Sequence, residues 1–199
     1  MTKNESKDQR INDILEAAVD IFVEKGYENT SMNEIAAHAG ISKGGLYHHF
    51  TSKDMIILSA SEKLSKPYEK IMSNAIQKDT SAESLRYFIH EYLKYWIEHK
   101  REYVFFLLLM SKTITHTGFT NEYESFTESN ISLFEQFYIR GIKNGEFADH
   151  NSRASGVTLM SALDGIISYM LLDSKLHLEE IVSNFEVIFI HPFLKKVVS

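Results

Sequence analysis

Proline is almost absent from this chain: in 199 residues it occurs only at Pro67 and Pro192. Because proline ends or kinks helices, so few prolines permit long uninterrupted helices along nearly the whole sequence. Apolar residues recur at helical spacing throughout, and we find no strand-like alternation and no internal repeat. The sequence therefore predicts an all-α fold.

The first predicted helix covers "RINDILEAAVDIFVEK", residues 10–25, and Gly26 supplies a left-handed stop. The next start signal is "SMNE", in which Ser31 can cap a helix while Glu34 returns a hydrogen bond to it. This second helix is short, and Gly40 ends it. The pattern therefore predicts two helices that are closed by glycines.

A third short helix follows after only a few residues, within "ISKGGLYHHFTSKD" at 41–54. Ser42 can cap it, and Leu46 and Phe50, four residues apart, share the face that anchors it. Two short helices joined by a tight glycine turn are typical of a helix-turn-helix unit. We therefore expect residues 1–66 to form an N-terminal three-helix DNA-binding domain.

Gly44 and Gly45 each cost the third helix roughly 1 kcal/mol relative to alanine. In a helix-turn-helix unit the second helix enters the DNA major groove with its N-terminus first. Residues without Cβ let the backbone come close to a phosphate or base edge, and the free amides at the helix start favour a phosphate. Groove and phosphate contacts are then expected from outward side chains, namely Lys43, Tyr47, His48 and Lys53.

The net charge of −6 does not favour a nucleic-acid binder, but the charge is unevenly distributed. From Ile35 through Lys53 there is no carboxylate, only two lysines and three histidines. Because salt screens exposed charges beyond about 10 Å, this local absence of acid matters more than the sum. The segment therefore permits a DNA contact.

The segment "TSMNEIAAHAGISKGGLYHHFTSKDMI" closely resembles the DNA-binding segment of tetracycline-repressor-like (TetR) regulators. The resemblance covers about the first third of the chain, and "ALDGI" at 162–166 is similar to a stretch of many members. This sequence departs from the family pattern at Gly45, where members often carry Ala, Ser or Thr. A side-chain contact is therefore absent there, and the operator sequence of a relative does not apply to this protein. The DNA-binding residues that we expect are Thr30, Ser31, Ser42, Lys43, Gly44, Gly45, Tyr47, His48, His49 and Lys53.

The rest of the chain, 67–199, is expected to form a larger helical effector-binding and dimerisation domain, with Pro67 as a hinge. Helical patterns cover 81–99, 101–115, 121–144, 152–173 and 178–190. The resemblance implies that the last two helices of each subunit form a four-helix dimer interface. Their apolar stripes could equally be core.

Fifteen of the 24 aromatic residues lie between Tyr68 and Tyr138. An aromatic pocket between helices is a common small-molecule site, although these rings could also simply fill the core. Asp164, inside an apolar helix, could meet a cationic or hydroxyl-bearing ligand, face solvent or bond across a dimer interface. The effector-binding residues that we expect are Tyr92, Tyr95, Trp96, Tyr123, Phe126 and Asp164.

Catalytic, metal and membrane functions find no support in the sequence. There is no cysteine, no HExxH, GxSxG or GxxxxGK[ST] motif, and adjacent His48 and His49 diverge by about 100° on a helix. The N-terminus lacks the apolar region of a secretory signal, and the longest apolar run, 104–110, is far below the ~20 residues of a membrane span. We expect a cytoplasmic protein without catalysis, cofactor or metal.

Two functions therefore remain open. The first is a homodimeric transcriptional regulator, a repressor that leaves its operator duplex when an apolar or aromatic small molecule binds. The alternative is an all-helical DNA-binding architectural or division-site factor without a ligand.

Overall fold

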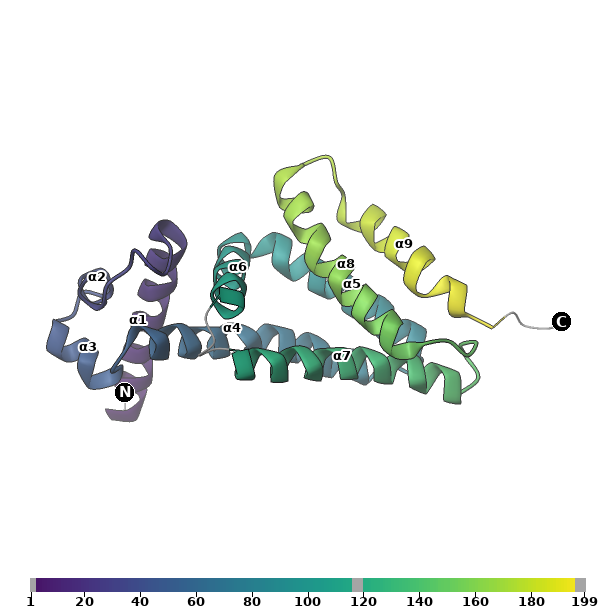
Figure 1. Ribbon diagram of the computed structural model, residues 1–199, viewed down its shortest axis with the longest axis horizontal. Helices are drawn as coiled ribbons and strands as arrows, with labels where there is room; N and C mark the ends of the chain where they lie inside the picture. Colours follow the sequence, from purple (N-terminus) through teal and green to yellow (C-terminus); the bar gives the residue numbers. More distant parts are fainter. Residues whose placement is uncertain (1–2, 116–119, 196–199) are drawn as a thin grey trace. The chain divides into compact units, whose positions relative to one another are not determined.

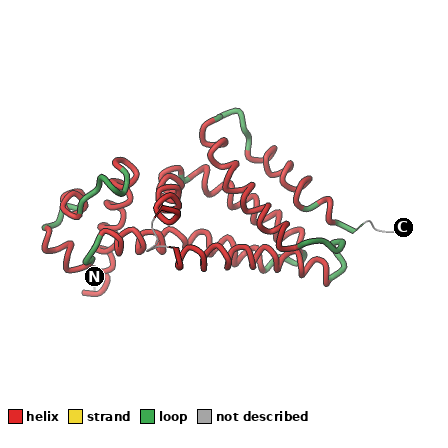
Figure 2. Tube along the Cα trace, in the orientation of Figure 1, coloured by secondary structure: helices red, strands yellow, loops and turns green. Residues whose placement is uncertain are grey.

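The computed structural model describes the backbone of residues 3–115 and 120–195 and the side chains of 7–115 and 127–195. Within these ranges the chain is helical between short loops, which confirms the all-α prediction (Figures 1 and 2). The α-helices are α1 (Lys3–Lys25), α2 (Met32–His38), α3 (Lys43–His49), α4 (Lys53–Ile76), α5 (Ser81–Glu98), α6 (Lys100–Thr115), α7 (Thr120–Lys143), α8 (Ser152–Leu172) and α9 (Leu178–Phe189). A short 3₁₀ turn, η2 (His191–Phe193), follows α9.

Most predicted helix ends agree with the structure to within one residue, but α1 begins at Lys3, seven residues before the predicted start at Arg10. The added segment, "KNESKDQ", is polar, so apolar periodicity could not reveal it.

The described residues form two compact units, and the division does not follow the chain order. The first unit takes residues 1–66 together with 101–118, and the second takes 67–100 and 119–199. The predicted domains, 1–66 and 67–199, placed α6 with the C-terminal part. In the structure α6 packs with the N-terminal helices instead.

Contacts with α1 explain the place of α6 in the first unit. The Arg101 guanidinium bonds the carboxylates of Glu16 at 2.9 Å and Asp20 at 2.6 Å. Beneath this cluster the rings of Phe22 and Phe105 lie 6.4 Å apart, and both side chains are fully buried. Helix α6 is thus held to α1 by ion pairs over a shared apolar core.

Pro67 does not end α4, which continues to Ile76 with the proline inside it. A proline within a helix removes one backbone hydrogen bond but leaves the remaining ones in place, so flanking turns can carry the helix past it. The helix was predicted to reach Pro67. The division between the two units nevertheless falls between Lys66 and Pro67.

In the second unit α7 and α8 form an antiparallel pair, and α5 packs against both. A close contact at the end of α7 requires a glycine: a Cβ on Gly141 would lie 2.2 Å from the ring of Phe147. Phe147 is fully buried, so its ring occupies the space that a side chain at Gly141 would need. Arg140 then ties α7 to the start of α5 by donating to the Ser81 and Ser84 hydroxyls.

Helix α8 is long and apolar enough to span a membrane, judged by length and composition alone. Of its most apolar stretch, 28% is buried within this chain. Several of its exposed side chains are apolar, including Val157, Tyr169 and Leu172. Helix α9 also exposes apolar side chains, Val187 and Ile188. The two last helices therefore leave a large apolar surface uncovered by this chain.

Candidate DNA-binding surface and aromatic cluster

The turn between α2 and α3 is built by local hydrogen bonds that the sequence predicted. Ser31 and Glu34 form the expected capping box: the Glu34 amide donates to Ser31 Oγ at 3.2 Å, and the Ser31 amide donates to Glu34 Oε2 at 2.9 Å. Gly40 then adopts the left-handed conformation, with φ of +65°. These features end α2 and redirect the chain into α3 within a few residues.

Ser42 caps α3, and its hydroxyl accepts a hydrogen bond of 3.0 Å from the amide of Gly45. A Cβ at Gly45 would lie 3.3 Å from that hydroxyl, so a side chain there would press on the cap. A Cβ on Gly44 would meet nothing within 4 Å. Gly44 therefore leaves open space at the start of α3, where an approaching molecule could reach the backbone.

Helix α3 has one buried side and one exposed side. Leu46 and Phe50 are buried, as the sequence predicted, and they anchor the helix to the first unit. Lys43 and His48 are exposed, and the Tyr47 side chain is 43% exposed. These three residues form one outward face with hydrogen-bond donors at fixed positions, which we call the α3 face.

His49 differs from its exposed neighbour His48. It is half-buried, and its pKa lies below the ordinary value because of burial and the nearby positive groups of His48, Lys7 and Arg10. The two imidazole rings meet edge to face, with centroids 5.3 Å apart. Within the described residues no group of three or more His, Asp or Glu could hold a metal ion.

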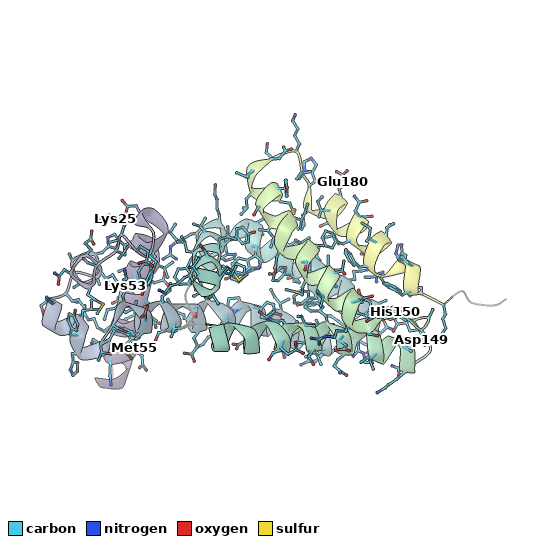
Figure 3. The ribbon with its side chains drawn as sticks, viewed as in Figure 1. Lys25, Lys53, Met55, Asp149, His150 and Glu180 are labelled. Carbon is cyan, nitrogen blue, oxygen red and sulfur yellow. The ribbon has the colours of Figure 1, made fainter. Side chains whose placement is uncertain are left out.

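Two expected DNA contacts, Thr30 and Lys53, have their polar groups engaged inside the first unit. Thr30 is buried, and its hydroxyl donates to the carbonyl of Gly26 at 2.8 Å. The Lys53 ammonium donates to the carbonyls of Tyr27 and Thr30, at 2.5 Å and 2.7 Å (Figure 3). Burial lowers the pKa of Lys53. Both residues therefore hold the loop before α2 in place.

Tyr27, which sequence reasoning missed, organises this loop. Its ring has the Lys53 ammonium 4.1 Å from its centroid and the Lys112 ammonium of α6 at 3.8 Å. Its hydroxyl donates to the Asp54 carboxylate. The pKa of Tyr27 is raised, mainly by burial and also by this hydrogen bond. No local pattern marks this cluster, because Lys112 is 85 positions away from Tyr27 in the sequence.

The start of α2 is less suited to a phosphate than the start of α3. Glu34 already occupies it and pairs with Lys25 at 2.9 Å. The hydrogen bond from Lys25, followed by those from Ser31, lowers the pKa of Glu34 to about 2. Ser31 is exposed, but its hydroxyl is engaged with Glu34.

In the second unit the predicted aromatic residues form a closely packed cluster. Tyr92 is 3% exposed and stacks on Phe88 with ring centroids 5.2 Å apart. Tyr68 and Trp96 meet the Tyr92 ring edge-on, at 6.0 Å and 6.1 Å. We call Tyr68, Phe88, Tyr92 and Trp96 the aromatic cluster.

Asp164 from α8 is the polar centre of this aromatic cluster. Asp164 is half-buried, and the Tyr92 hydroxyl donates to its Oδ1 at 2.7 Å. Burial raises the pKa of Asp164, and the bond from Tyr92 offsets part of that effect. Burial and the nearby Asp164 also raise the pKa of Tyr68, whose hydroxyl donates to Asn130 Oδ1 at 2.5 Å.

The other expected effector residues are not all brought together. Tyr95 lies beside Trp96, but its ring stacks on His99 with centroids 4.2 Å apart. Tyr123 and Phe126 lie outside the residues whose side chains the structure describes.

A surface cleft of about 570 Å³ lies elsewhere in the second unit, between α5 and α9. Its walls are mostly charged and include an Arg86–Glu186 ion pair of 2.9 Å. His90, also in the wall, contacts the Glu179 carboxylate at 3.3 Å. Among the described residues that line the cleft, Tyr87 is the one Phe, Tyr or Trp, and none is an expected effector residue.

Two protein-family models match this chain, one in the N-terminal part and one over most of the remainder. Residues 14–60 match the family "Bacterial regulatory proteins, tetR family", and residues 64–195 match the "QacR-like protein, C-terminal region". The second match covers more than half of the chain. The chain belongs to the TetR family of helix-turn-helix transcriptional regulators, which confirms the resemblance seen in the sequence.

Two relatives from Bacillus subtilis (strain 168) are similar over much of the chain. The uncharacterized HTH-type regulator YfiR is 31% identical over 176 residues, which span 84% of this chain and 82% of the relative. The uncharacterized HTH-type regulator YuxN is 30% identical over 131 residues, 66% of this chain, but the match spans only 44% of its own length.

Solved structures show the same fold. The TetR family regulator PfmR from Thermus thermophilus is 26% identical, with a TM-score of 0.75 over 92% of this chain and 99% of that chain. FadR from Bacillus subtilis, solved in complex with stearoyl-CoA, is 19% identical, with a TM-score of 0.77 over 90% of this chain and 97% of that chain. At that identity the likeness to FadR establishes a shared fold only.

Proposed function

We propose that this protein is a homodimeric repressor that binds operator DNA through the α3 face and leaves it when a small molecule enters the second unit. The observation that carries the DNA-binding part is the geometry of α3. Leu46 and Phe50 fix the helix, while Lys43, Tyr47 and His48 remain exposed beside an open, glycine-lined helix start. Because the relatives of this chain are transcriptional regulators, we infer that the protein binds DNA and catalyses no reaction. We also infer that it acts in the cytoplasm.

The α3 face is tested by removing its side chains. We expect Tyr47→Ala and Lys43→Ala each to weaken operator binding, because each loses a donor that faces the DNA. Removal of a phosphate contact should weaken binding to all sequences alike, whereas removal of a base contact should relax specificity at one position. Lys143→Ala, an exposed lysine at the end of α7, is the control.

The measurement uses operator fragments selected from genomic DNA by the purified protein, followed by gel-shift titration of folded variants. Unchanged affinity in both α3 variants would contradict the assignment of this face. Variants of Thr30 and Lys53 belong in a separate set, because loss of either should also disturb the loop that holds α2.

For the effector we propose the aromatic cluster and Asp164 as the binding site. A half-buried carboxylate that meets a tyrosine hydroxyl beside buried aromatic rings offers an apolar wall with a polar end, as small-molecule sites commonly do. Entry of a ligand requires the rings to move apart. The panel of candidate effectors to be tested contains apolar and aromatic compounds. It also contains acyl thioesters such as stearoyl-CoA, which is present in the FadR structure.

Release of DNA by the effector is a thermodynamic coupling that can be measured from either side. Reciprocity requires operator DNA to weaken effector binding by the same factor by which the effector weakens DNA binding. Trp96 fluorescence reports binding of a small molecule to the aromatic cluster. The affinity of that molecule is compared with and without saturating operator duplex. A ligand at 100 times its dissociation constant should also stabilise the fold by about 2.7 kcal/mol.

Tyr92→Phe is the sharpest variant for this site, because it removes the hydroxyl from Asp164 and keeps the ring. We expect DNA binding to remain and effector-induced release to weaken. Equal effector affinity with and without operator would show that the compound is no allosteric effector. Failure across a broad panel would favour the ligand-free architectural protein, for which the cluster is only core.

The dimer proposal rests on the apolar surface of α8 and α9. On the exposed side of α8 two small residues, Ser161 and Gly165, lie between the apolar Val157 and Tyr169 at a spacing of four residues. A Cβ on Gly165 would meet nothing within 4 Å, so a helix from a second copy could approach closely there. A second subunit would cover this surface and explains the exposed apolar face of α8 without a membrane.

A further inference from the structure

Two cations on α1 lie beside α3 and have no acidic partner among the described side chains. Lys7 and Arg10 are exposed and three residues apart, so they share one face of α1. Two other lysines of the first unit are paired, Lys25 with Glu34 and Lys63 with Glu16.

Both cations lie near the carboxyl end of α3. Their positive charges act on His49, whose ring in turn meets that of His48 on the α3 face. In the view of Figure 1 the N-terminal end of α1 lies near the chain that leaves α3. Lys7 and Arg10 thus lie close enough to His49 to act on its ring, and we call Lys7, Arg10, His48 and His49 the α1–α3 patch.

Three carboxylates of α1 are engaged with residues other than Lys7 and Arg10. Glu16 and Asp20 are paired with Lys63 and Arg101, and Asp13 accepts a hydrogen bond of 2.9 Å from Gln9. Asp8 follows Lys7 directly, so its side chain leaves the helix about 100° away. Among the described side chains, no carboxylate of α1 forms an ion pair with Lys7 or Arg10, and Asp8 and Asp13 are the negative charges nearest to them in the sequence.

The arrangement is unfavourable for the isolated protein. Positive groups gathered near each other repel. An anion placed against the patch would remove this cost. The duplex that meets the α3 face carries closely spaced phosphates, about one negative charge per 1.7 Å of helix axis.

We propose that Lys7 and Arg10 bind DNA phosphates next to the site contacted by α3, so that the DNA-binding surface includes the start of α1. This inference rests on the DNA binding proposed for α3. It adds a sequence-independent contact, since ammonium and guanidinium groups on phosphates position a protein on DNA without reading bases.

The test is the double variant Lys7→Gln/Arg10→Gln in the full chain. Its matched control is Lys66→Gln/Lys70→Gln, which removes the same charge from two exposed lysines of α4. Lys66 lies about 20 Å along α4 from its first residue. Circular dichroism and urea unfolding verify that each variant keeps its fold.

Binding to a mixed-sequence duplex of about 30 base pairs is measured by fluorescence anisotropy from about 50 to about 200 mM KCl. Each phosphate contact that is removed should reduce the slope of log K against log[salt] by about 0.9, hence by about 1.8 for each DNA-binding domain. We expect this change in the α1 variant and little change in the control. An unchanged slope in the α1 variant, or an equal change in both variants, would overturn the inference.

Tyr47→Ala separates this inference from the proposal for α3. If Tyr47→Ala weakens binding while the α1 variant retains wild-type affinity and slope, α3 binds DNA and the α1 surface does not. Ethylation interference on a selected operator adds a positional readout. Phosphates whose ethylation blocks the wild type but not the α1 variant would be those contacted by Lys7 and Arg10, and identical patterns would contradict the contact.

Discussion

Asp164, a half-buried carboxylate, joins α8 to α5 through its hydrogen bond with Tyr92. Its carboxylate lies among aromatic rings, where a charge is poorly solvated, and the Tyr92 hydroxyl supplies a bond that favours the ionised form. The raised pKa shows that burial outweighs this bond. A ligand that brings a better donor to Asp164 would therefore find a carboxylate already poised to accept it.

Asp164→Asn should change the pH dependence of stability in a defined direction. Because the folded pKa is raised, ionised Asp164 opposes folding, and its contribution is most favourable below the unfolded pKa of about 3.9 and is lost as pH rises through the folded value. The neutral variant lacks this term. We therefore expect the stability of Asp164→Asn relative to wild type to decrease as pH falls from 7 towards 4.

The measurement is the free energy of urea unfolding of both proteins at several pH values. Asp149→Asn, in the exposed loop before α8, controls for the general loss of a negative charge (Figure 3). A pH-independent difference between wild type and Asp164→Asn would contradict the raised pKa.

At the scale of elements, the helices form where local signals are strong and take their places through single close contacts. The capping boxes at Ser31 and Thr80 start α2 and α5 by bonds within four residues. The contact of Gly141 with Phe147 instead joins the end of α7 to the loop that leads to α8. The first kind of feature sets helix ends, and the second sets how helices pack.

Gly141→Ala should destabilise the protein by about 1–3 kcal/mol, because its methyl group must displace the buried Phe147 ring. This result would reverse the usual benefit of alanine over glycine inside a helix. Urea unfolding measures the change. In a Phe147→Leu background the same substitution should cost less, and equal costs in both backgrounds would show that the ring is not the obstacle.

At the scale of the whole molecule, two compact units have different tasks. The first carries the helix-turn-helix and α6, and the second carries the aromatic cluster and the uncovered apolar side of α8 and α9. Helix α4 has residues in both units and is continuous from Lys53 to Ile76. Tyr68, in the part of α4 that belongs to the second unit, is the residue that α4 supplies to the aromatic cluster.

Dimerisation should depend on the last two helices. Leu172 is 85% exposed and Ile188 is 57% exposed, so aspartate at both positions should leave the isolated fold intact while placing charges in the proposed interface. We expect Leu172→Asp/Ile188→Asp to be monomeric at micromolar concentration by light scattering. Ile114→Asp, at a 77% exposed position in α6, should remain dimeric. A dimer that survives the double variant would place the interface elsewhere.

Most helix ends and the helix-turn-helix were predictable because their causes are local. Ser31 with Glu34, and Ser42 with Gly45, are three residues apart, and the positions of Leu46 and Phe50 follow from helical periodicity. The same reasoning placed Lys43, Tyr47 and His48 outward. Such signals act within one or two turns, so they can be identified before the fold is known.

What only the tertiary structure decided are the partners of side chains that meet across long stretches of sequence. Tyr92 and Asp164 are 72 positions apart, and Arg101 and Glu16 are 85 apart, yet these pairs fix the aromatic cluster and the place of α6. Lys53 points inward because the carbonyls of Tyr27 and Thr30 meet it there. Helical periodicity determines which face a residue occupies, whereas the neighbour on that face depends on how distant helices pack.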